Sequence, residues 1–87
     1  MARVMSLADE LTSEREQLVK AIRDIEEGEQ RFRRQALLSA NLAAKGLSTG
    51  EAERLLRALA DALEEWIVHR GLIEGRIAYL EDLQSGN

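Results

Sequence analysis

A single short break divides the chain into two long runs of helical periodicity, and this break constrains the fold more than any other feature. It lies between Gly46 and Glu51. Gly46 suits the left-handed backbone conformation that ends many helices. Ser48 and Glu51 have the spacing of a capping box, in which each side chain accepts a hydrogen bond from the other residue's backbone N–H. The sequence therefore predicts a turn at 46–48.

In the first run, apolar residues recur every seven positions, close to the heptad of a coiled coil. The column consists of Val4, Leu11, Leu18, Ile25 and Phe32. Opposite charges four residues apart, such as Glu29 and Arg33, mark the solvated faces. We expect one helix over about 6–45. A second capping-box pattern at Ser13 and Glu16 leaves open a later helix start.

The second run repeats the pattern and predicts a helix over about 49–84. Its column consists of Ala52, Leu59, Trp66, Ile73 and Leu80. The phase is kept through Gly71 and Gly75, which favours one continuous helix. The alternative ends a helix at His69-Arg70-Gly71, where two cations precede a glycine, and gives three helices in all.

The two runs together predict an all-α fold, a long antiparallel helical hairpin formed by a single domain over residues 1–87, with frayed ends at 1–5 and 85–87. A turn at 46–48 sets Gly28 opposite Trp66, so that the smallest residue faces the largest. The predicted core and dimer residues are Leu18, Ile25, Gly28, Phe32, Leu59, Leu63, Trp66, Ile73, Ile77 and Leu80.

A hairpin of 87 residues has one interface and a marginal core. Around Trp66, the apolar residues Ile67, Val68 and Leu72 lie outside the main stripe, as in a helix that packs against more than one partner. We therefore expect two hairpins to associate about a twofold axis into a homodimeric four-helix bundle.

Composition removes several classes of chemistry. The chain has no cysteine, which excludes disulfides, thiolate catalysis and cysteine-based metal sites. A single histidine argues against a histidine-based metal site within one chain. Neither a glycine-rich phosphate loop, a nucleophile elbow nor a dinucleotide fingerprint is present. We predict no enzyme activity, no catalytic residue, no cofactor and no metal.

The one histidine, His69, has two interpretations. The first is a boundary residue hydrogen-bonded to a carboxylate such as Glu65. The second is a phosphoryl-accepting histidine, because Val68-His69-Arg70-Gly71 resembles the histidine region of histidine-phosphotransfer domains. The Leu-Lys-Gly usual after that histidine is missing here.

The net charge of −4 gives no general attraction to nucleic acid or to an anionic membrane. The first ten residues lack the apolar core of a signal peptide. The least polar stretch, 36–44, is too short to span a bilayer. We expect a soluble, cytoplasmic protein without membrane contact.

The charge is unevenly distributed, however. Residues 30–60 hold six bases and two acids, a local balance of +4, whereas the rest of the chain has a balance of −8. The turn end is thus basic and the terminal end acidic. This clustering has two explanations. One is surface salt bridging, and the other is a docking surface for an acidic protein or for RNA. The candidate partner-binding residues are Arg31, Arg33, Arg34, Lys45, Arg54 and Arg57.

Several turn and core positions resemble a group of short, uncharacterised bacterial helical-hairpin proteins. The matching residues lie within residues 25–70 and are Gly28-Glu29, Arg31, Gln35, Gly46, Thr49, Ala52, Leu55-Leu56 and His69-Arg70. The resemblance implies a helical hairpin and no known activity.

The leading functional hypothesis is a non-enzymatic protein-interaction or regulatory module that acts as a homodimeric bundle, with an unidentified protein partner. The alternative is an RNA-binding module that uses the basic turn end, by analogy of architecture with the small dimeric hairpin protein Rop. A third hypothesis is phosphotransfer through His69.

Overall fold

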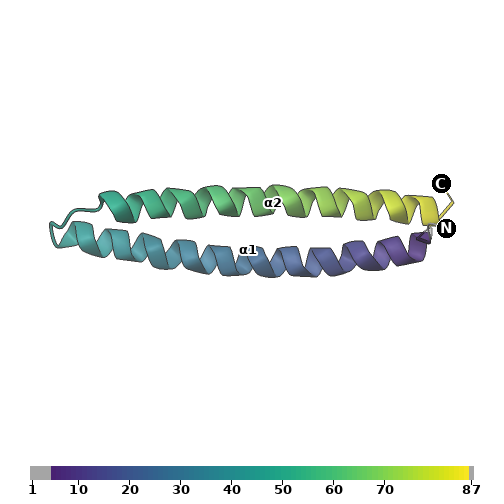
Figure 1. The fold of residues 1–87 in the computed structure, drawn as a ribbon, viewed down its shortest axis with the longest axis horizontal. Helices are drawn as coiled ribbons and strands as arrows, with labels where there is room; N and C mark the ends of the chain where they lie inside the picture. Colours follow the sequence, from purple (N-terminus) through teal and green to yellow (C-terminus); the bar gives the residue numbers. More distant parts are fainter. Residues whose placement is uncertain (1–4, 87) are drawn as a thin grey trace.

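A computed structural model describes residues 5–86 and contains two long α-helices joined by one short connection. Helix α1 spans Leu7–Ala44 and helix α2 spans Gly50–Gln84. The helices run antiparallel and side by side along a molecule 63 Å long, and both chain ends lie at the same pole (Figure 1). The predicted all-α antiparallel hairpin is confirmed.

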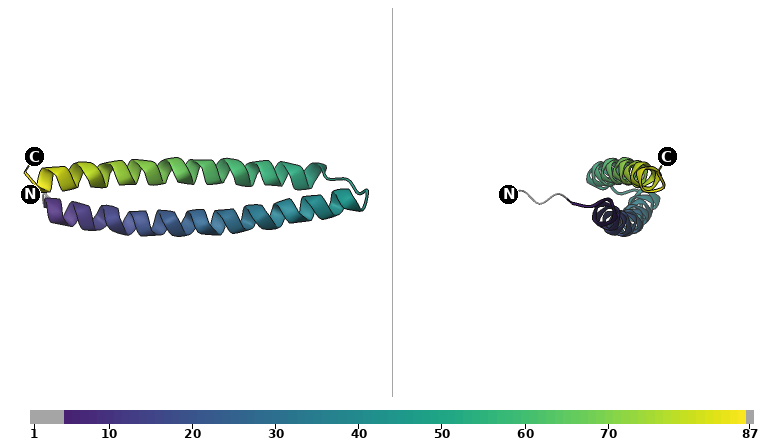
Figure 2. Two further views of the ribbon diagram at one scale, coloured as in Figure 1. Left: turned by 180° about the vertical axis from the view of Figure 1, so that it is seen from behind. Right: turned by 90° about the vertical axis from the view of Figure 1, so that its right-hand side faces the viewer.

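Both helices are continuous, as the heptad phase predicts. Helix α1 begins before Ser13 and continues through Gly28, and α2 continues through Gly71 and Gly75. The alternatives with a later start of the first helix, or with a third helix after position 71, are therefore wrong. Viewed end-on, the two helices form one layer, and both faces of that layer lie open along its length (Figure 2).

The first helix begins at a true N-cap. Ser6 has extended backbone angles, and its hydroxyl oxygen accepts a hydrogen bond from the Asp9 N–H at 3.1 Å. Asp9 and Glu10 in the first turn add favourable charge at the positive end of the helix dipole.

Hydrogen bonds continue past the end of α2. Ser85 and Gly86 donate their N–H groups to the carbonyls of Glu81 and Leu83. The predicted fraying of 5, 85 and 86 stays a prediction. The predicted fraying of 1–4 and 87 lies outside the described residues.

The end of α1 is closed by a Schellman motif. Gly46 has φ +69°, and its N–H donates to the Ala43 carbonyl at 3.0 Å. The Leu47 N–H donates to the Leu42 carbonyl at 2.9 Å. These two bonds satisfy carbonyls that would otherwise lack a partner at the helix end. The left-handed conformation predicted for Gly46 is confirmed.

The predicted capping box is wrong. The N-cap of α2 is Thr49, not Ser48, and the Thr49 side chain makes no capping hydrogen bond. Because the Schellman motif already uses Gly46 and Leu47, the chain needs two more residues to reach the second helix. Ser48 therefore lies one position before the cap, out of reach of the amides that it would satisfy. The connection covers 45–49 rather than 46–48.

The interface between the helices is a narrow seam with heptad spacing. Five residues of the described chain are buried: Leu11, Ala21, Ile25, Ser39 and Ile73. Of the ten predicted core residues, Ile25 and Ile73 are among these, and the other eight are half-buried. One helical interface covers only one side of each stripe, so most of the seam keeps partial contact with solvent.

The predicted pairing of Gly28 with Trp66 is wrong. A Cβ atom placed on Gly28 would lie 3.3 Å from Cδ1 of Leu63, and this is the side chain that covers the glycine. The Trp66 ring is half-buried and lies instead at the edge of the seam, where the Nζ atom of Lys20 is 5.3 Å from its centroid.

Polar groups also occupy the seam. The Gln35 side-chain amide donates to the Ala52 carbonyl at 3.0 Å and so ties the two helices together near the turn. Near the termini, Glu14 lies 3.3 Å from the Arg76 Nε atom. These contacts are satisfied only when the helices are correctly aligned, so they favour one register over its slipped alternatives.

Candidate interaction face

Large apolar side chains lie both in the seam and outside it. Thirteen of those in the described residues are exposed, and exposed area of this kind marks a binding surface when it is contiguous. The exposed residues are Met5, Leu7, Val19, Ile22, Leu37, Leu38, Leu47, Leu55, Ile67, Val68, Leu72, Tyr79 and Leu83.

Near the turn, the two helices form a groove of about 370 Å³, here called the turn-end groove. Its lining residues are Arg31, Arg34, Gln35, Leu38, Leu55 and Leu59. Leu38 on α1 and Leu55 on α2 are each 49% exposed, and Leu59, which lines the same groove, is half-buried. The groove thus combines leucine side chains with two guanidinium groups.

In the middle of the molecule lies a smaller groove of about 320 Å³, the middle groove, lined by Glu65, Trp66 and His69. The His69 ring meets the Trp66 ring edge-on, with centroids 5.7 Å apart and planes at 72°. Lys20 adds a cation to the indole ring from α1. Such contacts stabilise by about 0.5–1 kcal/mol each at exposed positions.

This placement corrects the expected role of His69. The ring is exposed and contacts an indole, and among the described residues it makes no hydrogen bond to Glu65 or to another carboxylate. Phosphotransfer through His69 stays a prediction.

Near the chain ends lies the terminal groove, of about 470 Å³. Its lining residues are Met5, Glu10, Ser13, Glu14, Arg76, Tyr79 and Leu80. Tyr79 is 62% exposed. Glu14 and Arg76 form an ion pair across the groove floor, and the second Glu14 oxygen is buried without a hydrogen-bond partner. This groove combines an aromatic ring and apolar side chains with two carboxylates.

The three grooves lie on one face, here called the groove face. On α1, Glu10, Arg31 and Leu38 are separated by multiples of seven residues. On α2, Leu55 and His69 are also separated by a multiple of seven. Residues with this spacing keep the same orientation in a pair of heptad helices. Most of the groove-face residues were missed from sequence because they flank the apolar column, although the same seven-residue spacing marks them.

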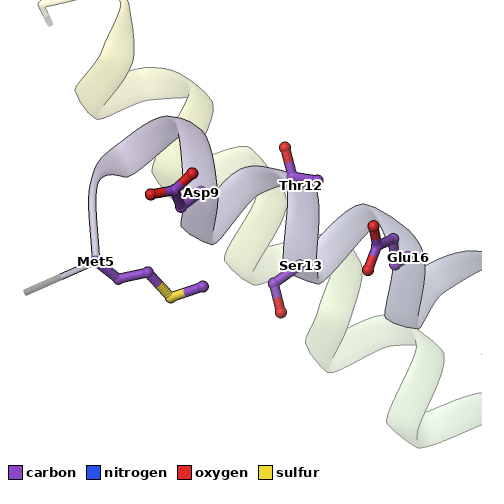
Figure 3. A pocket seen from close by; sticks show the side chains of 5 residues that line it. All are labelled: Met5, Asp9, Thr12, Ser13 and Glu16. Carbon is purple, nitrogen blue, oxygen red and sulfur yellow. The ribbon is translucent and has the colours of Figure 1, made fainter. Parts of the chain in front are cut away.

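A further hollow of about 610 Å³ lies beside the first turns of α1 (Figure 3). Its lining residues are Met5, Asp9, Thr12, Ser13 and Glu16. Figure 3 shows Asp9 and Glu16 on separate turns, with the two hydroxyl groups between them. The Thr12 hydroxyl donates a hydrogen bond to the Ala8 carbonyl at 3.0 Å, so its proton is engaged within the helix.

Across residues 5–86, no group of three or more His, Asp or Glu side chains is placed to hold a metal ion. The expectations of no metal, no cofactor and no enzyme activity stay predictions.

The six predicted partner-binding bases divide into two groups, and all of them are exposed. Arg31 and Arg33 lie 4.0 and 3.7 Å from the carboxylates of Glu27 and Glu29, one turn back on α1. The other four have no ion pair within the described part of the chain; they are Arg34, Lys45, Arg54 and Arg57. Surface salt bridging therefore explains only part of the basic cluster.

Comparison with protein-family models, with curated proteins and with solved structures found no match for this chain. The resemblance to short bacterial hairpin proteins stays a prediction. Neither of the two described helices combines the length and apolarity needed to cross a bilayer.

Proposed function

We propose that this chain is a non-enzymatic protein-interaction module that acts as a homodimer, in which two hairpins form a four-helix bundle. The exposed surface carries the proposal. A compact monomer of 9.8 kDa exposes roughly 5,200 Å². This hairpin exposes 6653 Å². The excess of roughly 1,500 Å² exceeds the roughly 800 Å² that each partner buries in an interface of standard size.

The apolar content of that surface supports the same proposal. Exposed leucine, isoleucine and valine side chains occur on both helices, and only one seam buries apolar area within a single chain. Burial contributes about 25 cal/mol per Å², so a second interface adds a favourable term that the single hairpin lacks. We also propose a cytoplasmic location, with which a chain without cysteine is compatible because it forms no disulfide.

The test is the solution mass, measured by sedimentation equilibrium at micromolar concentrations together with helicity by circular dichroism. We expect twice the chain mass of 9.8 kDa and a highly helical spectrum. A single-chain mass at full helicity would overturn the proposal, because it would show that one seam alone supports the fold.

A second candidate function is RNA binding at the turn end, supported by the four bases there that have no ion pair. RNA bound mainly through phosphate contacts loses affinity steeply as salt rises. Binding of labelled RNA hairpins at low ionic strength, lost when Arg54 and Arg57 are changed to glutamine, would support this candidate. Failure to bind at low ionic strength would exclude it.

A further inference from the structure

We infer that the second copy of this chain binds across the groove face in an antiparallel orientation, so that the turn of one hairpin lies beside the chain ends of the other. The inference rests on the proposed homodimer and specifies its surface and geometry. Three independent features support it: the position of the grooves, the charge of the two poles and the content of the two outer grooves.

The positions of the grooves fit a twofold axis across the middle of the molecule. On α2, Leu55 of the turn-end groove and Tyr79 of the terminal groove lie at equal distances from position 67, beside Trp66 and His69 of the middle groove. A twofold axis perpendicular to the helices between Trp66 and His69 therefore superposes the turn end of one hairpin on the terminal end of the other. With the axis at this central position, the two molecules overlap along their whole length, and all three grooves are covered.

The charge of the two poles selects this orientation. Residues 30–60 around the turn have a balance of +4, the terminal stretches 1–20 and 70–87 together have −2, and the central stretches 21–29 and 61–69 have −6. A parallel dimer would place basic beside basic and acidic beside acidic. An antiparallel dimer places each basic pole beside the acidic pole of its partner. Like charges brought together across an interface are unfavourable, so charge decides between two arrangements that apolar burial alone does not distinguish.

The contents of the outer grooves are complementary as well. The turn-end groove presents Leu55 from α2 together with Arg31 and Arg34 from α1. The terminal groove presents Tyr79 beside Glu10. Superposing the two brings a leucine against an aromatic ring and guanidinium groups near a carboxylate, the arrangement of an interface with an apolar centre and a charged rim.

The chain has no cysteine, which makes disulfide cross-linking a direct test of the geometry. We expect Leu55→Cys mixed with Tyr79→Cys to give a covalent dimer of the two variants under mild oxidation, because the axis brings these two α2 positions together. Leu55→Cys alone should give none, because the two copies of position 55 lie at opposite ends. His69→Cys alone should cross-link to itself, because it lies close to the twofold axis. Leu37→Cys is the matched control, since residue 37 is 63% exposed but lies outside the grooves.

Each outcome decides between arrangements. Self-cross-linking of Leu55→Cys would overturn the antiparallel orientation, because only a parallel dimer joins those positions. A dimeric mass with no cross-link in any groove-face variant would overturn the choice of face and leave the homodimer standing. A single-chain mass for the unmodified protein would overturn the proposed function itself. Circular dichroism of each variant checks that the helices are retained.

Charge reversal gives an independent readout. The double variant Arg31→Glu/Arg34→Glu should raise the dimer dissociation constant at least about tenfold at low salt, and adding Glu10→Arg should restore part of the affinity. In a parallel dimer the double variant would instead relieve repulsion at the turn end and tighten association. Arg33→Glu is the control, because Arg33 makes the same charge change outside the grooves.

Discussion

Single residues at the turn and in the seam fix how the two helices meet. Gly46 adopts φ +69°, which a side chain at this position would strain, and it carries one of the two hydrogen bonds that close α1. Gly28 has an ordinary helical conformation, and its small size matters because the Leu63 side chain covers it. Gly46 is therefore required for its backbone conformation and Gly28 for its small size. Substitutions at the two positions should change stability in different ways.

Gly46→Ala should lower the free energy of unfolding by about 1 kcal/mol, because alanine is strained in the left-handed conformation. The comparison is Gly75→Ala, at a helical position where a Cβ atom would have no neighbour within 4 Å. That change should raise stability by up to about 1 kcal/mol through helix propensity. Urea unfolding at fixed protein concentration measures both. An equal gain in the two variants would contradict the assigned backbone conformation.

Gly28→Ala should change stability little or raise it by a few tenths of a kcal/mol. The gain in helix propensity opposes a contact of 3.3 Å, which the flexible end of the Leu63 side chain relieves by a small shift. Gly28→Leu should lower stability by about 1–3 kcal/mol, because its larger side chain cannot fit in the seam. Thermal unfolding of both variants checks this. A loss on Gly28→Ala as large as that on Gly28→Leu would show that Leu63 cannot move.

At the scale of elements, the two helices begin differently although both have a hydroxyl residue at the cap. Helix α1 has a bonded N-cap at Ser6, whereas Thr49 makes no side-chain capping bond at the start of α2. Two helices with similar heptad patterns therefore depend to different degrees on local capping. Packing against α1 stabilises the first turn of α2. The hydrogen bond from the Gln35 amide to the Ala52 carbonyl adds to this.

Ser6→Ala should lower the free energy of unfolding by about 1 kcal/mol, since it removes the acceptor for the Asp9 N–H. Ser48→Ala is the matched control and should leave stability within about 0.5 kcal/mol of the parent, because Ser48 precedes the cap and is exposed. Urea unfolding gives both values. A larger loss for Ser48→Ala than for Ser6→Ala would restore the capping box at 48–51.

The Nε atom of Arg70 is buried without a hydrogen-bond partner and lies 3.8 Å from a Glu74 oxygen. Arg70→Leu should therefore raise stability by up to about 1 kcal/mol, because an apolar side chain at a seam position avoids the unpaired donor. Arg23→Leu, at an exposed position of α1, is the control and should change stability by less than about 0.5 kcal/mol. Thermal unfolding measures the difference. A clear loss on Arg70→Leu would show that the arginine stabilises the seam.

At the scale of the whole molecule, shape and charge act together. A single layer of two helices leaves both faces open (Figure 2). One of these faces holds the turn-end, middle and terminal grooves. The basic turn end and the slightly acidic terminal end lie at opposite ends of a rod 63 Å long, and most of the acidic excess lies between them. Because the two ends of the molecule differ in charge, parallel and antiparallel association across the groove face differ in stability.

If the homodimer is the folded unit, the midpoint of thermal unfolding should rise with protein concentration, by a few degrees for each tenfold increase. Calorimetry across the micromolar range measures this. The Arg31→Glu/Arg34→Glu variant should show a lower midpoint at each concentration at low salt, because its dimer is weaker. A midpoint independent of concentration would contradict a coupling between folding and association.

Much of the fold is readable from the chain alone. The heptad columns predict two helices to within one residue of each bound, and Gly46 predicts where the first one ends. These predictions succeed because local periodicity and backbone conformation depend on nearby residues. The predicted capping box is wrong because it depends on how many residues connect the helices. The predicted pairing of Gly28 with Trp66 is wrong because it depends on the register of the helices and on the orientation of the Trp66 ring.

The sequence by itself determined the element type, the single reversal at Gly46 and the separation of basic and acidic poles along the chain. Only the tertiary structure decided that Leu63 covers Gly28 and that Leu38, Trp66 and Tyr79 share one face. The physical reason is that the register of two helices is set by side-chain packing and by a few cross-helix hydrogen bonds, such as that of Gln35 to Ala52. A heptad repeat alone is satisfied equally well by neighbouring registers.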